Sequence, residues 1–243
     1  MDKRAPEQTD TASGNGFHRA VRSYVLRAGR VTEGQKRALE TLWPVWGVDA
    51  GQDLLDFEVL FGNDHPVIME IGFGNGEATW RMASEHPGEN YLGVEVHKPG
   101  VGRLLLKVEE HGLENVRIAC HDAVEVLQRQ VQDESLDGVR IYFPDPWPKK
   151  RHHKRRIVQP TFVALLARKM RAGGILHLAT DWEPYAEFML DVMRPISDFE
   201  NLSPFGDFCP RPDWRPLTKY ESRGERLGHK VSDLLYRRAE REA

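Results

Sequence analysis

The chain has 243 residues, which is enough for one large domain with a buried core. Its 34 lysines and arginines are outnumbered by 37 acidic residues, so the formal net charge of −3 excludes a uniformly basic nucleic-acid coat. Two cysteines, Cys120 and Cys209, exclude a disulfide framework, and no apolar run approaches the roughly 20 residues of a membrane span. We therefore expect a cytoplasmic protein with no membrane segment and no metal site.

The chain begins with two segments of different composition. Residues 1–16 are polar and are predicted to be a disordered tail. Residues 17–54 form a predicted basic N-terminal extension, in which six lysines and arginines stand against two acidic residues between positions 17 and 46. The sequence leaves open whether this extension contacts a nucleic acid or packs on the following domain, which we place at residues 55–243.

Short apolar runs alternate with amphipathic helical patterns from residue 66 onward. Three helical patterns follow the prolines at positions 99, 160 and 184, each with apolar residues three and four positions apart. Buried strands that alternate with such helices predict a parallel sheet covered on both faces. The predicted strands are 67–71, 91–96, 116–120, 139–143 and 175–179, and 231–236 is a candidate for a late strand that returns to the sheet.

A carboxylate stands at or near the end of each of the first five predicted strands. Ligands of open parallel sheets bind beyond the carboxyl ends of the strands, so these side chains are expected to meet at one edge. They are Glu70, Glu95, Asp122, Asp145 and Asp181. Taken singly, Glu95 is also compatible with a solvated loop residue and Asp122 with a helix N-cap, but their repetition at successive strand ends favours a binding site.

The first predicted strand runs into a glycine-rich turn, Gly72-Phe73-Gly74-Asn75-Gly76. Glycine permits positive φ angles and close approach of a ligand, although an ordinary βα turn would show the same residues. A dinucleotide-binding turn requires Gly-x-Gly-x-x-Gly, whereas here the third glycine comes one residue early and acidic residues flank the turn. A cationic ligand without phosphates suits this turn better, and S-adenosylmethionine is such a ligand. Glu95 would then accept hydrogen bonds from the ribose hydroxyls, and Asp122 would face the adenine amino group.

The fourth predicted strand leads into Pro144-Asp145-Pro146-Trp147, which a basic run from Lys149 to Arg156 follows. The two prolines restrict the backbone around Asp145 and so fix the direction of its carboxylate. The basic run carries six cations in eight residues and no acid, which favours contact with the phosphates of a nucleic acid. The alternatives are a turn-forming aspartate and a solvated charged surface.

These motifs together resemble those of a known enzyme family. The glycine turn with Glu70, Glu95 and Asp122 resembles the cofactor motifs of class I S-adenosylmethionine-dependent methyltransferases. The strand-four motif, the basic run, Thr180-Asp181 and the segment Thr218-Lys219-Tyr220-Glu221-x-Arg223-Gly224 resemble the tRNA (guanine-N7)-methyltransferases of the TrmB family. The resemblance covers about residues 55–238, with Pro148 as its main departure. It implies an α/β, Rossmann-like fold with a seven-stranded, mostly parallel sheet and helices on both faces.

The resemblance also implies an enzyme that transfers the methyl group of S-adenosylmethionine to N7 of guanine in tRNA, at position 46 of the variable loop. The predicted cofactor-binding residues are Glu70, Gly72, Gly74, Gly76, Glu95, Asp122 and Asp145, of which Asp145 is also the predicted catalytic carboxylate. The residues implied to bind the target are Lys149, Asp181, Thr218, Lys219, Tyr220 and Glu221. The residues expected to contact the RNA backbone are Lys150, Arg151, Lys154, Arg155 and Arg156.

Two other functions remain open at this point. One is a class I methyltransferase that acts on rRNA or protein, and the other is a non-catalytic RNA-binding module on a Rossmann scaffold. The glycine spacing and Glu77 disfavour a nicotinamide-dependent oxidoreductase. The expected partner is tRNA, and the sequence does not distinguish a monomer from a homodimer.

Overall fold

A computed structural model describes residues 22–24, 29–228 and 230–240 of the chain. The tail predicted for residues 1–16 lies outside these described residues. The strands of the described part are β1 Gly47–Val48, β2 Val67–Ile71, β3 Asn90–Val94, β4 Val116–Ala119, β5 Leu136–Tyr142, β6 Met170–Thr180, β7 Phe199–Asn201 and β8 Ser232–Arg238. The helices are α1 Glu33–Thr41, α2 Trp43–Trp46, α3 Phe57–Phe61, α4 Glu77–Glu85, α5 Lys98–His111, α6 Ala123–Arg129, α7 Pro160–Lys169, α8 Glu183–Met193 and α9 Lys219–Arg226, together with the 3₁₀ helix η1 at Lys150–Arg155.

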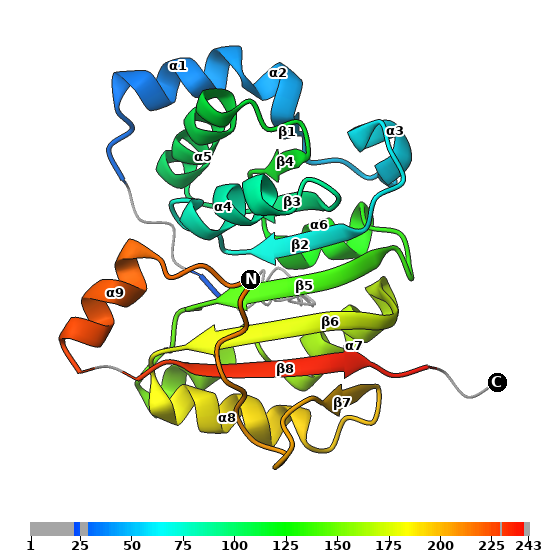
Figure 1. Ribbon diagram of the computed structural model, residues 1–243, viewed down its shortest axis with the longest axis vertical. Helices are drawn as coiled ribbons and strands as arrows, with labels where there is room; N and C mark the ends of the chain where they lie inside the picture. The colour runs from blue at the N-terminus through cyan, green and yellow to red at the C-terminus, as the bar shows by residue number, and fades with distance from the viewer. Residues whose placement is uncertain (1–21, 25–28, 229, 241–243) are drawn as a thin grey trace, which may run out of the picture.

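These strands form one mixed sheet in the order β1-β4-β3-β2-β5-β6-β8-β7 (Figure 1). The strands from β1 to β6 pair in parallel, and β8 runs antiparallel to both β6 and β7. The five predicted parallel strands and the late strand near 231–236 are confirmed as β2 to β6 and β8. The predicted number of seven strands is one too small, because β1, a two-residue strand of the N-terminal extension, joins the edge beside β4.

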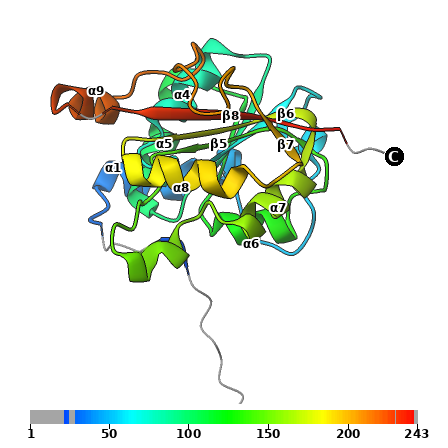
Figure 2. The ribbon, with the colours of Figure 1, turned by 90° about the horizontal axis from the view of Figure 1, so that it is seen from below.

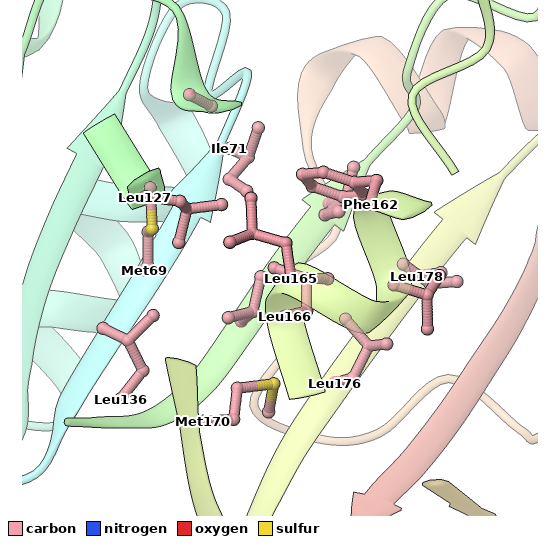
Figure 3. Close-up of a cluster of buried hydrophobic side chains, with 14 of the residues drawn as sticks. Met69, Ile71, Leu127, Leu136, Phe162, Leu165, Leu166, Met170, Leu176 and Leu178 are labelled. Carbon is pink, nitrogen blue, oxygen red and sulfur yellow. The ribbon is translucent and has the colours of Figure 1, made fainter. Parts of the chain in front are cut away.

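Helices cover both faces of the sheet, as the sequence pattern predicts. On one face, α6, α7 and α8 pack against the sheet and form a core that includes Leu127, Phe162, Leu166, Met69 and Leu176 (Figures 2 and 3). On the other face, α4 and α5 form a second core with β2, β3 and β4. Burying one such side chain fully stabilises the fold by about 1.5–3 kcal/mol. The two cores therefore hold the strand ends in fixed positions.

The described part of the N-terminal extension packs on α5 and β4. Thr32 and Gln35 form a reciprocal capping box at the start of α1. The Gln35 side chain also donates a 3.0 Å hydrogen bond to the Pro99 carbonyl oxygen, and a Cβ on Gly102 would lie only 3.0 Å from the Gln35 carbonyl oxygen. Trp46 Nε1 donates to the Leu113 carbonyl oxygen at 2.9 Å. The segment from α1 to β1 is thus a structural part of the domain.

The carboxyl ends of the parallel strands lie at one edge of the sheet. In Figure 1 the arrowheads of β2, β5 and β6 point towards this edge, and α9 lies beyond them. The pairing of Tyr142 with Ala179, and of Ala179 with Asp233, brings the ends of β5 and β6 level with the start of β8. The segments that carry the predicted site residues therefore converge at this edge.

Candidate active site at the carboxyl ends of the strands

A cavity of about 220 Å³ opens at the ends of β2, β3, β4 and β5. Three of the predicted carboxylates line it, Glu95, Asp122 and Asp145. Apolar side chains such as Ile71 and Ile141 form much of the remaining wall, and no lysine or arginine of the described residues lines it. Such a wall suits a cationic ligand and disfavours one with phosphates, as the glycine turn predicts.

The turn after β2 needs glycine for its backbone conformation and its packing. Gly72, Gly74 and Gly76 have φ angles of 73°, 59° and 73°, which residues with a side chain rarely adopt. A Cβ on Gly76 would lie 2.7 Å from the Leu104 Cβ, because α5 packs directly against the turn. Of the three predicted glycines, Gly72 lines the cavity, whereas Gly74 and Gly76 lie outside its wall.

Backbone N–H groups hold the Glu95 carboxylate in one orientation. Its Oε1 accepts hydrogen bonds from the backbone nitrogens of Val96 and His97 at 2.7 and 3.0 Å. Its Oε2 accepts from the Gly74 nitrogen at 2.9 Å, which ties the end of β3 to the glycine turn. Hydrogen bonds to an ionised acceptor are among the stronger ones in proteins. Glu95 therefore presents a fixed carboxylate to the cavity, which suits a residue that binds a ribose diol.

Asp122 has both of the roles that the sequence left open. Its Oδ1 accepts from the Val124 nitrogen at 2.8 Å and so caps α6. It also lines the cavity, as does Tyr24. Burial and the nearby Asp122 carboxylate raise the pKa of Tyr24, so the phenol stays protonated. The cap and the binding role are compatible because the residue stands at the helix start and the cavity wall at once.

Glu70 lies behind the cavity wall. Its side chain is buried, and the Thr79 hydroxyl donates a 2.6 Å hydrogen bond to its Oε2. Burial raises the pKa of Glu70 to about 7, although the Thr79 hydrogen bond and the charge of Arg140 act in the opposite direction. In this structure the carboxyl group joins β2 to α4, and its predicted contact with the cofactor stays a prediction.

Asp145 lines the cavity from a strained segment that follows β5. Phe143 and Trp147, two residues before and after it, have φ angles of 51° and 44°, which are rare for residues other than glycine. Such conformations cost about 1–3 kcal/mol each and are typical of functional sites. Trp147 Nε1 donates to the Ser23 carbonyl oxygen at 3.0 Å, which helps to hold the segment. Asp145 itself is exposed, so its carboxylate is accessible to a substrate.

The basic run folds into η1, which divides its cations into exposed and packed ones. Lys149, Lys150, Arg151 and Lys154 are exposed. Arg155 donates to the backbone carbonyl oxygens of Arg22 and Tyr24 at 3.1 Å each, and its guanidinium lies 4.0 Å from the centre of the Trp147 ring. Arg155 therefore fastens the described residues 22–24 to the site.

The structure does not support the predicted contact of Arg156 with the RNA backbone. Its side chain is only 3% exposed, and its Nε donates to the Pro146 carbonyl oxygen at 2.9 Å. The guanidinium also lies over the rings of Tyr185 and Phe188. Arg156 thus supports the proline-flanked segment from inside the protein, and its guanidinium is not exposed to a phosphate at the surface.

Asp181 lies beside a second hollow, of about 460 Å³, and does not line the first cavity. The structure therefore does not bring Asp145 and Asp181 into one pocket. Tyr220 links their segments, because its hydroxyl donates to Asp181 Oδ2 at 3.2 Å and its ring centre lies 5.2 Å from that of Phe143. Asp181 and Tyr220, both predicted to bind the target, thus contact each other.

The other residues predicted to bind the target stand at the start of α9. Thr218 Oγ1 accepts from the Glu221 nitrogen at 3.3 Å, as a helix cap does. The Lys219 nitrogen donates to Glu77 Oε2 at 3.1 Å and so joins α9 to α4. Glu221 is buried and accepts two hydrogen bonds from Arg215, at 2.6 and 2.8 Å. This engagement does not support a contact between Glu221 and the target.

Sequence reasoning missed several residues of the cavity wall. Ser23 and Tyr24 come from the N-terminal extension, and Ile157 follows the basic run. The composition of the extension is compatible with contact to a nucleic acid or with packing on the following domain. Nothing in the spacing of its arginines and aromatic residues places Ser23 and Tyr24 beside Asp122. Only the tertiary contacts of Trp147 and Arg155 with this segment locate it.

The described residues lack two further features, a membrane-spanning helix and a cluster of metal ligands. None of their helices combines the length and the apolar character needed to cross a bilayer. Among the same residues, no group of three or more histidine, cysteine or acidic side chains is arranged to hold a metal ion.

The fold and the cavity together define a class of enzyme. A mostly parallel sheet with helices on both faces, a glycine turn after a central strand and carboxylates at the neighbouring strand ends make this chain a class I S-adenosylmethionine-dependent methyltransferase. The crystal structure of the 16S rRNA methyltransferase KamB has a similar fold, with a TM-score of 0.55 at 16% identity over 78% of this chain and 96% of that chain.

Sequence relatives narrow this class to one family. A family model described as "Putative methyltransferase" matches residues 64–234. The chain is 55% identical over 218 residues to a tRNA (guanine-N(7)-)-methyltransferase of Alcanivorax borkumensis, which covers 90% of this chain and 91% of the relative. It is 54% identical over 228 residues to the protein of the same name from Streptomyces avermitilis, which covers 94% and 79%. The chain belongs to the tRNA (guanine-N7)-methyltransferase family.

Proposed function

We propose that this protein transfers the methyl group of S-adenosylmethionine to N7 of a guanine in tRNA and so forms 7-methylguanosine. Family membership supports the reaction and the class of substrate. The structural observation that carries the proposal is Asp145, an accessible carboxylate on a strained segment at the wall of a cavity with two further carboxylates. From the motif resemblance, we place the target guanine at position 46 in the variable loop.

The residues of the cavity fit S-adenosylmethionine. When bound, this cofactor supplies an electrophilic methyl group on a sulfonium ion. We assign Glu95 to the ribose hydroxyls and Asp122 to the adenine amino group, while Gly72 lets the backbone approach the ligand. The described wall holds no lysine or arginine that would repel a sulfonium.

Methylation of guanine N7 does not require the protein to remove a proton from the attacking atom. N7 carries an in-plane lone pair and no proton, so no strong base is required. The site must instead orient N7 towards the methyl group and stabilise the positive charge that develops on the purine. The Asp145 carboxylate stabilises this charge, and it can accept hydrogen bonds from guanine N1–H and the exocyclic amine. The same contacts select guanine over adenine.

The target nucleotide has further candidate contacts around Asp145. The exposed Lys149 follows the strained segment directly. The contact between Asp181 and Tyr220 lies outside the cavity, but the Tyr220 ring contacts Phe143 of the segment that carries Asp145. Thr218 and Lys219 stand beside it at the start of α9. We propose that these residues hold the target nucleotide, and that the exposed cations of η1 contact the backbone of tRNA.

Nucleoside mass spectrometry tests the proposed function. Unmodified tRNA incubated with the protein and S-adenosylmethionine should gain 7-methylguanosine, whereas heat-denatured protein should add none. Methyl groups found on rRNA or protein in place of tRNA would indicate a different methyltransferase. Calorimetry with S-adenosylhomocysteine gives an independent result, because a non-catalytic RNA-binding module would bind none.

Replacing Lys150, Arg151 and Lys154 together by alanine should weaken tRNA binding and flatten its salt dependence. All three side chains are exposed on η1, so their removal should leave the fold intact. We expect the slope of log Kd against log salt concentration to fall by about 0.7–0.9 for each phosphate that the variant no longer neutralises. Filter binding at several salt concentrations measures this slope, and the affinity for S-adenosylhomocysteine should not change.

A matched triple variant distinguishes a local contact from a general effect of charge. Arg168, Arg171 and Arg194 are 51%, 55% and 69% exposed and lie towards the amino ends of the strands. Replacing these three by alanine should leave the slope nearly unchanged. An equal decrease of the slope in both triple variants would refute phosphate contact at η1.

A further inference from the structure

A buried chain of polar side chains joins the end of β5 to α9. The Tyr142 hydroxyl lies 3.0 Å from His177 Nδ1, and His177 Nε2 lies 2.7 Å from Asp233 Oδ1. Arg215 donates to Asp233 Oδ2 at 3.0 Å and to both Glu221 oxygens. None of these five side chains is more than 8% exposed. These hydrogen-bonded side chains thus extend across the sheet from β5 through β6 to β8 and end at α9.

His177 is a neutral ring that connects Tyr142 on one side to Asp233 on the other. Burial lowers the pKa of His177, although the hydrogen bond with Asp233 acts in the opposite direction. Because an Asp233 carboxylate beside Arg215 can only accept, Nε2 carries the ring proton and Nδ1 is free to accept from Tyr142. Burial raises the pKa of Tyr142, so its hydroxyl keeps the proton that it donates.

Arg215 is the branch point of the chain. Its guanidinium contacts one carboxylate on β8, Asp233, and another on α9, Glu221. A buried charge that loses its partner carries a large desolvation penalty. The first turn of α9 therefore cannot move away from β8 without leaving Arg215 and Glu221 partly unpaired inside the protein.

The same guanidinium also lies close to the segment that leads to Asp145. Its central carbon is 6.0 Å from the ring centre of Tyr142 and 5.8 Å from that of Phe143. Phe143 has the positive φ angle at the start of the strained segment, and it contacts Tyr220 of α9. Arg215 thus contacts both segments that we propose to surround the target nucleotide.

We propose that Arg215, together with His177 and Asp233, positions the first turn of α9 against the segment of Asp145, so that Thr218 and Tyr220 meet the target nucleotide. All three are positioning residues, because none of them lines the cavity. This inference rests on the proposed function of the Thr218–Tyr220 segment as part of the target site. It gives Glu221 a role as the anchor of α9, in place of the predicted contact with the target.

Arg215→Met and Arg215→Lys test the inference in steady-state methylation assays with tRNA. Arg215→Met should lower kcat and kcat/KM for tRNA by a factor on the order of ten to a hundred, because small displacements of positioning groups have effects of this size. Its Kd for S-adenosylhomocysteine should match the wild type. Arg215→Lys keeps the charge but lacks the planar fork, so it should recover part of the activity.

Arg238→Met controls for reduced stability. Arg238 is also 3% exposed and donates to the Ala167 carbonyl oxygen at 2.7 Å, but it stands at the far end of β8. This variant should lower the Tm while leaving kcat and KM unchanged at temperatures where it is folded. Equal decreases of activity in Arg215→Met and Arg238→Met at such a temperature would overturn the positioning role. Glu221→Gln repeats the test if Arg215→Met does not fold.

Two further variants separate this inference from the proposed function. Wild-type kcat/KM in both Thr218→Ala and Tyr220→Ala would mean that the segment does not bind the target, and the proposed function of α9 would fail. Loss of activity in those two variants with full activity in Arg215→Met would leave that function intact and refute the positioning role alone.

Discussion

Asp145→Ala should reduce methylation of tRNA by about a hundredfold to a thousandfold at saturating cofactor, which is the usual effect of removing one group that stabilises charge in a transition state. The carboxylate is exposed at the wall of the cavity, so its loss removes this stabilisation without opening a hole in the core. Single-turnover assays on unmodified tRNA measure the effect on the chemical step directly.

Two comparisons make this result specific. Asp145→Asn keeps the size of the side chain but lacks the charge, and it should lose most of the activity because N7 becomes cationic as the methyl group is transferred. Asp191→Ala, which removes a carboxylate that is 69% exposed on α8, should retain wild-type activity. A folded Asp145→Ala variant with wild-type rates would remove Asp145 from the reaction.

The arrangement of the sheet was predictable because its signals are local. The prolines at 99, 160 and 184 stand at the first or second position of α5, α7 and α8, as their place before each apolar pattern indicates. The strands β2 to β6 are apolar runs bounded by loops. By contrast, β1 and β7 have two and three residues, which is too short for any periodicity, and only their pairing with β4 and β8 reveals them.

The site was less predictable because it depends on side-chain direction. Successive residues of a strand point to opposite faces of the sheet, so Ile71 lines the cavity while Glu70 points towards Thr79 of α4. A position near a strand end therefore did not suffice to place Glu70 in the wall. The basic run shows the same limit, because the turn of η1 exposes Arg151 and Lys154 but buries Arg156.

Contacts between distant parts of the chain could not be predicted from the sequence. Tyr24 and Asp122 line the same cavity although nearly a hundred positions separate them in the sequence, and no local pattern connects them. Arg215 lies in the loop before α9 and Asp233 in β8, yet the buried hydrogen bonds that join them fix the start of α9. The motif resemblance identified Thr218 to Glu221, but it could not show that Glu221 faces inward.

Glu70→Gln should stabilise the fold at alkaline pH and leave it little changed at acidic pH. Burial raises the pKa of Glu70 from 4.5 to about 7, so between these values the unfolded chain is ionised while the folded protein stays protonated. Ionisation of the unfolded chain alone lowers the free energy of unfolding as pH rises through this window, and above about pH 7 the loss is complete. Glutamine has no proton to lose and can still accept the Thr79 hydrogen bond.

The difference in unfolding free energy between Glu70→Gln and the wild type should therefore grow by roughly 2–3 kcal/mol from pH 5 to pH 8, since one pKa unit corresponds to about 1.4 kcal/mol. Urea titrations at both pH values measure it, with Glu200→Gln as the exposed control. A difference that does not change with pH would show that the carboxyl group is not held protonated in the folded protein. The S-adenosylhomocysteine affinity of Glu70→Gln at pH 8 tests the predicted cofactor contact separately. An unchanged Kd would limit Glu70 to joining β2 and α4, because a carboxylate that binds the cationic end of the cofactor cannot be replaced by an uncharged amide without a decrease in affinity.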